Sequence, residues 1–435
     1  MSHLKLFTLI SLLGLGKLTT NELQLQQSAD GLLTLWLDHS SGISSDFLIG
    51  SANKTVNLLP FVNLDLILIA AKNCSNINGF QEYDPAQSDW WSFSNDKWNS
   101  QLEVSPFSRM PQYFRGSMIR DSFCPKNGTK ECVTNETEKH TTFFLVTEVN
   151  GTLNIGNNDG ILGLAPSQRE GFKSYLDILK EQGRIIRKSF SYKYDKDTPR
   201  MVFGDFDEES RSVSFEKLPT RDGDLIYGAK ILHYEFNGVE IDFGTNSYFT
   251  FEPSISYNLF LIRDQQVFNA TITKLNETLQ SMNEHSMLLG DGEALVPFFK
   301  GMTCKDAQLY TSTFKIDLRG IILEPNLFAI SNDVFNNCIM RMGFVYNPNL
   351  TEGVDNLYIM TGETLGDTVL SINFDSEELV LAGGYAKKGA IIRLWGWIAI
   401  ISGIFLLIAI IGFVVHKVRQ GKLSRRLDQY ETIQQ

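Results

Sequence analysis

The sequence lacks the residue patterns of several common functional classes. With 39 Lys and Arg against 50 Asp and Glu, the net charge is −11, and the missing basic excess argues against nucleic acid as a partner. There is no His-Glu-x-x-His or Cys-x-x-Cys pair, and the six histidines are scattered, so we expect no metal and no cofactor. A Gly-x-Ser-x-Gly nucleophile turn and a phosphate-binding loop are also missing.

The negative charge is concentrated in the body of the chain. Residues 18–386 contain 29 Lys and Arg against 48 Asp and Glu, a net charge of −19, whereas both ends are basic. Residues 1–20 combine an early lysine, a short apolar run and small residues, which predicts a signal peptide. Residues 394–415 are apolar and uncharged, and as a helix of about 33 Å they would span a bilayer.

More basic residues follow this segment than precede it, which places its C-terminal side in the cytoplasm. We therefore expect a single-pass type I membrane protein with a lumenal or extracellular body and a cytoplasmic tail at 416–435. In the tail, Tyr430 and Ile433 have the spacing of a sorting signal read by clathrin adaptors. A plain solvated tail is the alternative. The signal would fit a protein of the cell surface or of endosomes and lysosomes.

Export to an oxidising compartment makes disulfides possible in the body. Five cysteines allow at most two internal bridges, and proximity favours Cys124 with Cys132 and Cys304 with Cys338, leaving Cys74 over. The body also contains eight Asn-x-Ser/Thr sequons that permit N-glycosylation, at Asn53, Asn73, Asn127, Asn135, Asn150, Asn269, Asn276 and Asn349.

Short runs of β-branched and aromatic residues, separated by Gly, Asn and Asp, predict a mainly β body. Clear runs occur at residues 143–146, 190–194, 201–203, 213–215 and 379–381. One stretch, residues 172–182, has helical spacing of its apolar residues, and Gly183 can end that helix.

The segment Asp159-Gly-Ile-Leu-Gly-Leu164 resembles a segment of the pepsin family of aspartic proteases. Further resemblances follow in the family's order, at residues 83–88, 182–185, 190–191, 201–205, 359–362, 372–375 and 379–383. The resemblance implies an all-β, bilobal fold of two β-barrel-like lobes with a central cleft, at 21–205 and 206–386. It also implies the Cys304–Cys338 disulfide of the C-terminal lobe.

Cleavage in this family needs two facing aspartates, one from an Asp-Thr/Ser-Gly loop in each lobe. The pair shares one proton, so that one carboxylate activates a water while the other donates to the scissile carbonyl. The resemblance identifies Asp242 as the second aspartate, with Gly244 and Thr245 in register and Phe243 in place of the usual Thr or Ser.

The first aspartate has no counterpart in this register. Counting forward from Ile49-Gly50, or backward from Cys74, brings Phe61, Val62 and Asn63 onto the Asp-Thr-Gly positions. Two other acids could substitute. Asp38 lies too close to the start of the mature chain, and Asp65 lacks the following Thr-Gly.

The flap that covers substrate in this family resembles the segment around Tyr113, with Gly116 and Ser117 in register but Phe114 in place of a glycine. Tyr113 is therefore either a flap tyrosine or an ordinary packed aromatic. Our leading hypothesis is a membrane-anchored pseudoprotease that binds a peptide or protein in its cleft. The alternative is an active aspartic endopeptidase that uses Asp242 with Asp65 or Asp38.

Overall fold

A computed structural model of the chain describes most of the body between residues 33 and 382. The described ranges are 33–37, 43–75, 83–93, 102–103, 113–126, 140–150, 158–168, 173–194, 199–206, 210–219, 225–255, 257–284, 286–290, 294–310, 314–325, 332–334, 337–350, 353–366 and 368–382. The predicted signal peptide, the segment 394–415 and the tail lie outside them. Of the helices within these ranges, none is long and apolar enough to cross a membrane.

The body is mainly β, as predicted. Nine strands form one sheet: β2 (Ser45–Ile49), β3 (Lys54–Phe61), β4 (Ile67–Ser75), β5 (Ser92–Phe93), β6 (Leu102–Glu103), β7 (Tyr113–Asp121), β8 (Phe123–Pro125), β9 (Thr141–Asn150) and β10 (Gly160–Gly163). Four form a small sheet: β15 (His233–Phe236), β16 (Val239–Glu240), β21 (Phe314–Leu318) and β22 (Ile321–Leu323).

Fifteen strands form the largest sheet: β1 (Leu33–Trp36), β11 (Ser189–Lys193), β12 (Arg200–Phe203), β13 (Ser212–Pro219), β14 (Leu225–Lys230), β17 (Ser247–Phe251), β18 (Asn258–Ile262), β19 (Ser286–Gly290), β20 (Ala294–Phe299), β23 (Asn332–Val334), β24 (Asn337–Ile339), β25 (Met342–Tyr346), β26 (Asn356–Met360), β27 (Val369–Asn373) and β28 (Glu378–Ala382). The apolar runs named above lie in β9, β11, β12, β13 and β28, and only Tyr194 falls beyond its strand.

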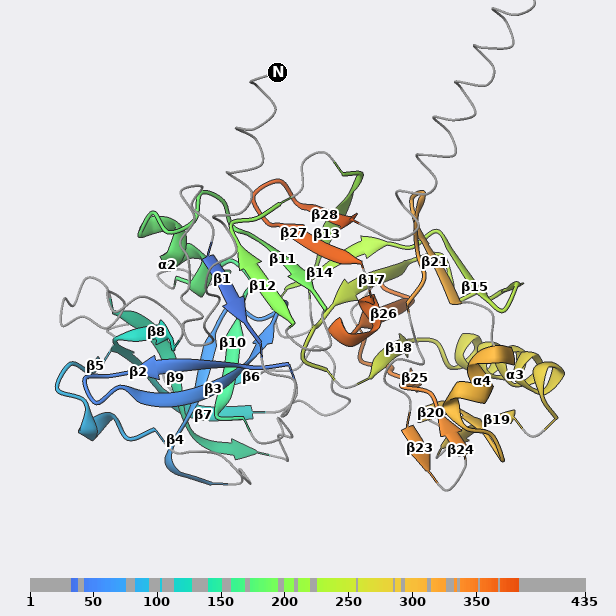
Figure 1. Cartoon of the computed structure of the whole chain (residues 1–435), viewed down its shortest axis with the longest axis horizontal. Coiled ribbons are helices and arrows are strands. Elements are labelled where there is room, and N and C mark those ends of the chain that lie inside the picture. The colour runs from blue at the N-terminus through green and yellow to red at the C-terminus, as the bar shows by residue number, and fades with distance from the viewer. Residues whose placement is uncertain are drawn as a thin grey trace, which may run out of the picture.

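Two groups of four strands have the same topology. In the first, β3 runs parallel to β10, β10 antiparallel to β4, and β4 parallel to β9. In the second, β17 runs parallel to β26, β26 antiparallel to β18, and β18 parallel to β25. We call the nine-stranded sheet, which contains the first group, the first unit, and the part of the chain from β14 to β26, which contains the second group, the second unit. Figure 1 shows the two groups on opposite sides of the molecule. The chain therefore repeats one supersecondary pattern.

A central stretch of sheet lies between the two units (Figure 1). Here β11 pairs with β27, and β28 pairs with β13, so a hairpin from the C-terminal part of the body is inserted between earlier strands. In every sheet of the described residues the strand order runs between two edge strands. The barrel-like closure expected of the lobes is therefore corrected to open sheets, because the edge strands do not pair with each other.

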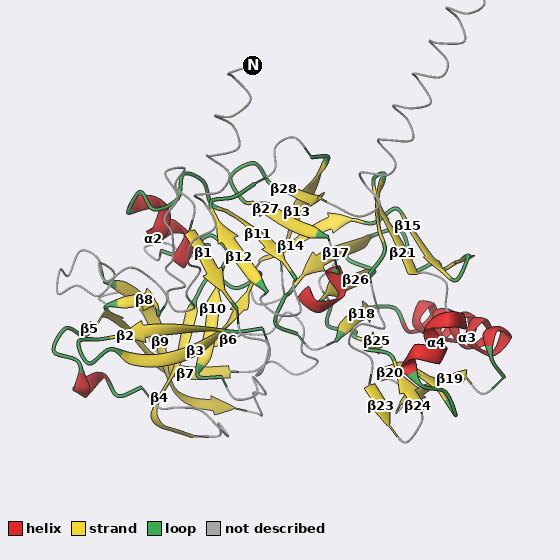
Figure 2. Cartoon of the chain, in the orientation of Figure 1, coloured by secondary structure: helices red, strands yellow, loops and turns green. Residues whose placement is uncertain are grey.

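Three α-helices, α2 (Tyr175–Glu181), α3 (Gln265–Met282) and α4 (Cys304–Tyr310), and the short 3-10 helices η1 (Pro85–Gln87) and η4 (Gly362–Leu365) complete the described elements (Figure 2). The predicted helix is confirmed as α2, which begins with a capping box between Ser174 and Asp177. The long helix α3 was not predicted, because two of its five buried positions are Thr271 and Thr278, which weaken the apolar pattern.

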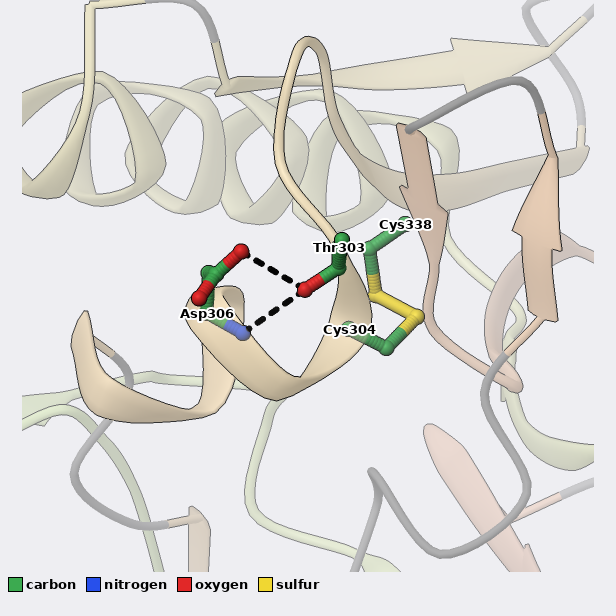
Figure 3. Close-up of a disulfide and its surroundings, with 4 residues drawn as sticks. All are labelled: Thr303, Cys304, Asp306 and Cys338. Atoms are coloured by element: carbon green, nitrogen blue, oxygen red, sulfur yellow. Dashed lines mark hydrogen bonds between the residues drawn. A yellow bond between two sulfur atoms is a disulfide. The ribbon is translucent and has the colours of Figure 1, made fainter.

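The predicted disulfide between Cys304 and Cys338 is confirmed and joins α4 to β24 (Figure 3). Just before Cys304, the Thr303 hydroxyl accepts a hydrogen bond from the Asp306 amide at 3.2 Å and caps the helix. The predicted partnership of Cys124 with Cys132 is corrected. Cys124 is a free, buried thiol that donates to the Pro125 carbonyl, and Cys132 lies outside the described residues.

Candidate functional site

The loops that follow β3 and β17 meet where the two units touch. Val62 is the first residue after β3, and Glu252 is the first residue after β17. The Val62 backbone N–H donates to both carboxylate oxygens of Glu252, at 3.1 Å each. We call this contact the junction. It joins residues 190 positions apart, and it places one acidic side chain between the units.

Glu252 is completely buried. Burial raises the pKa of its carboxyl to about 8, and hydrogen bonds from Val62 and Asn63 offset only part of that rise. The side chain therefore stays protonated up to mildly alkaline pH, although several donors surround it. A neutral carboxyl carries no charge that would lose its hydration on burial, so the fold tolerates this side chain in a fully buried position.

Asn63 and Thr250 form a second layer of polar contacts beside Glu252. The Asn63 amide donates to the Thr250 hydroxyl at 3.1 Å and accepts from the Tyr227 backbone N–H at 2.9 Å. The Thr250 hydroxyl in turn donates to the Tyr227 carbonyl at 2.9 Å. Ser254 donates to the Pro60 carbonyl across the same boundary. These side chains hold the two loops in fixed positions.

The predicted first motif lies at the junction but brings no acid to it. Phe61 is half-buried and pairs with Gly163, while Val62 is buried and contributes its backbone N–H. A Cβ at Gly163 would lie 2.3 Å from the Leu66 carbonyl oxygen, so only glycine fits this crossing. The glycine pattern at 160–163 is thus explained by close backbone packing.

Of the two acids considered as substitutes, the structure describes Asp65 but not Asp38. Asp38 lies outside the described residues. Asp65 is buried and accepts a hydrogen bond from the Gln168 backbone N–H at 3.0 Å. The Gln168 side chain continues this chain of contacts to the Leu225 N–H and the Tyr227 hydroxyl. Asp65 therefore anchors a segment of backbone beside the junction.

Asp242 lies before β17, whereas the junction follows it. Asp242 shares a pocket with Ser247 at one end of this strand, and Glu252 follows the other end. Asp242 is exposed, accepts a hydrogen bond from the Gly244 N–H at 2.9 Å and lines a pocket with Thr245. The structure therefore brings Asp242, Gly244 and Thr245 together with one another, and brings Phe61, Val62 and Asn63 together with Glu252.

Phe243, the residue that departs from the expected Asp-Thr/Ser-Gly motif, has a packing role. Phe243 is buried and stacks on Phe260 with ring centroids 5.0 Å apart, and it also packs edge-to-face on Tyr234. A Thr or Ser at this position would remove that aromatic contact from the core. The departure from Asp-Thr/Ser-Gly is therefore a consequence of core packing.

The predicted flap residues lie in β7. Gly116 stands at an irregularity in the β7–β9 register, where a Cβ would lie 1.9 Å from the Leu145 carbonyl oxygen. Ser117 follows it in regular pairing with Leu145. The backbone of Tyr113 begins β7, but its side chain lies outside the described part of the chain.

Glu252 is the candidate residue that the sequence interpretation missed. It stands in Phe251-Glu-Pro-Ser254, directly after an apolar strand, as Val62 directly follows β3. The polar run after that strand was the available signal, but the nearby Asp242-Phe-Gly-Thr245 looked more like the expected motif. Within the described residues, no cluster of three or more His, Cys, Asp or Glu could hold a metal ion.

The geometry therefore offers one buried carboxyl at the junction, already contacted by backbone and side-chain donors, and a second buried carboxyl beside it at Asp65, which holds the Gln168 backbone. A third, exposed carboxylate lies in a separate pocket. In comparisons with known proteins, no family model and no curated protein matches the chain.

Proposed function

We propose that the chain is a membrane-anchored, two-lobed protein of the pepsin type that binds a peptide or protein without cutting it. The repeated strand pattern of the two units and the glycine-rich crossing at 160–163 support a pepsin-like arrangement. The membrane anchor at 394–415 and the lumenal or extracellular location of the body rest on the sequence alone.

The single observation that carries the proposal is the composition of the junction. Cleavage of the pepsin type requires two facing carboxyls that share a proton. Glu252 supplies one, and residues 61–64 opposite it are Phe, Val, Asn and Leu. Moreover, both oxygens of Glu252 accept a hydrogen bond from Val62, so the carboxyl is committed to joining the units. Removing one member of a catalytic pair typically lowers the rate by orders of magnitude.

A proteolysis assay tests this proposal. Full-length protein in detergent would be incubated with an acid-unfolded protein between about pH 3 and 6, with and without pepstatin, because a carboxyl pair would titrate there. We expect no pepstatin-sensitive cleavage. Cleavage that is lost in Asp242→Ala or Asp65→Asn would instead establish the alternative, an active endopeptidase with an irregular pair.

The binding half of the proposal needs its own measurement. Peptide arrays probed with the full-length protein should reveal a selective set of extended sequences. The matched variant is Glu252→Gln, which keeps the shape of the side chain and cannot ionise. A protein that neither cleaves nor selects any peptide would show that the two units serve a purely structural role.

A further inference from the structure

A pocket in the second unit stands apart from the junction. It has a volume of about 620 Å³ and is lined by the β14–β15 connection, the turn between β16 and β17, and α3. That volume lies within the range of small-molecule sites, about 300–1,000 Å³. The pocket lies at the start of β17, whereas Glu252 follows the other end of that strand.

The helix α3 fixes the shape of the pocket through two contacts to backbone carbonyls. Thr271 donates to the carbonyl of Asp242 at 3.3 Å, and Lys274 donates to the carbonyl of Glu240 at 2.5 Å. Gly244, with a φ of 98°, allows the turn to close on the Asp242 carboxylate. The turn is thus held by α3 and by its own Gly244–Asp242 hydrogen bond before any ligand arrives, which lowers the ordering cost of binding.

The pocket presents accessible charges of both signs. Asp242 is exposed, and the described contact of its carboxylate, to Gly244, uses one oxygen. Lys230 forms no ion pair or hydrogen bond with another described side chain, and the described contact of the Lys274 ammonium uses one of its three donors. The remaining acid, Glu240, pairs with His233 at 3.1 Å. Two carboxylates, of Asp242 and Glu240, and two ammonium groups therefore remain available to a ligand.

An apolar wall completes the lining. Leu232 is 60 % exposed although it borders the pocket, and the buried side chains of Phe243 and Ile241 also line it. An exposed leucine beside charged groups favours a ligand that has an apolar part as well as charges.

We infer that this pocket binds a free amino acid or a very short peptide with both ends unblocked and an apolar side chain. The ligand ammonium pairs with Asp242, its carboxylate pairs with Lys230 and Lys274, and its side chain covers Leu232. A ligand with both charges leaves neither pocket charge buried and unpaired, which is the costly outcome. A ligand with only negative charge would be repelled by the two acids that line the pocket, and a ligand with only positive charge would be repelled by the two lysines. The inference does not rest on the proposed function.

The test uses leucine and Leu-Leu as probes, each with free ends, with the amine acetylated, with the carboxylate amidated, or with both ends blocked. Affinity would be measured by calorimetry on the full-length protein in detergent. We expect a free-ended probe to bind, and each block to weaken binding at least tenfold. Leucine and Leu-Leu distinguish a free amino acid from a peptide end.

Two substitutions connect each end of the ligand to a residue. Asp242→Asn, which keeps the acceptor for Gly244, should abolish the penalty of acetylation but not that of amidation. Lys230→Met should reduce the penalty of amidation, because only Lys274 then remains for the ligand carboxylate, and should leave the penalty of acetylation unchanged. Lys173→Met, a surface lysine paired with Glu181, is the matched control and should change nothing. Equal binding of doubly blocked probes, absence of binding by every probe, or no end-specific effect of either substitution would overturn the inference.

Discussion

The two units share a strand pattern but contribute opposite chemistry where they meet. After β3, the first unit offers backbone N–H donors and the amide of Asn63. The second unit offers the hydroxyl of Thr250, which lies in β17, and the carboxyl of Glu252, which directly follows that strand. A symmetric framework has thus become an asymmetric one, because the carboxyl of the contact comes from the second unit. Donors come from both sides, since Tyr227 donates to Asn63 and Ser254 donates to the Pro60 carbonyl. Such a contact is well suited to fastening the units together.

The units also differ in how each is secured. The second unit has the disulfide between Cys304 and Cys338, whereas the first has a buried free thiol at Cys124. Part of the stability of the second unit is therefore covalent, and that of the first depends on packing. Three measurements sharpen this comparison or break it.

The largest effect is expected from pH. Because the pKa of Glu252 is about 8 in the folded protein and about 4.5 in the unfolded chain, stability is fully present below pH 4.5 and is lost as pH rises to about 8. The cumulative loss is at most about 5 kcal/mol. Denaturant unfolding of the wild type and of Glu252→Gln at several pH values measures it.

The difference between the two proteins isolates Glu252, because every other titrating group is common to both. A difference that stays constant from pH 4.5 to 8 would show that the carboxyl titrates normally. The Glu252 carboxyl would then be an ordinary ionised carboxylate.

The second effect concerns the disulfide. Replacing Cys304 and Cys338 with alanine opens a loop of 34 residues, and loop-closure entropy predicts a loss of about 3–4 kcal/mol. Cys124→Ala in the first unit should cost only about 1 kcal/mol, because it removes one buried sulfur. Thermal unfolding of both variants measures the difference. Equal losses of stability in the two variants would mean that the disulfide adds no constraint on the unfolded chain.

The smallest effect concerns the amide layer of the junction. Asn63→Ala leaves the Tyr227 N–H without its acceptor and should cost about 1–3 kcal/mol. Thr250→Val should be coupled to it in a double-mutant cycle by at least about 0.5 kcal/mol, since the two side chains bond directly. Thr245→Val, on an exposed turn, is the control and should cost under about 0.5 kcal/mol. If the losses of unfolding free energy from Asn63→Ala and Thr250→Val simply add, the two side chains are not coupled, and their contact does not help to join the units.

The sequence predicted features that depend on local patterns. Short runs of β-branched and aromatic residues located strands, the spacing of apolar residues located α2, and cysteine positions located the bridge of the second unit. It did not reveal the role of Glu252, because that role comes from a contact with a residue 190 positions away. Nor did it assign Phe243 to the core, since its aromatic partners lie on other strands.

The inserted hairpin of β27 and β28 has a consequence for the order in which the protein folds during synthesis. β11 pairs with β12 but gains its second neighbour only when residues 369–373 have been made, and β13 pairs with β14 but gains its second neighbour only with residues 378–380. Until then both strands present open edges, which favour mispairing with other chains. The central sheet is therefore completed last, and a ribosome that stops before residue 369 releases a chain in need of a chaperone.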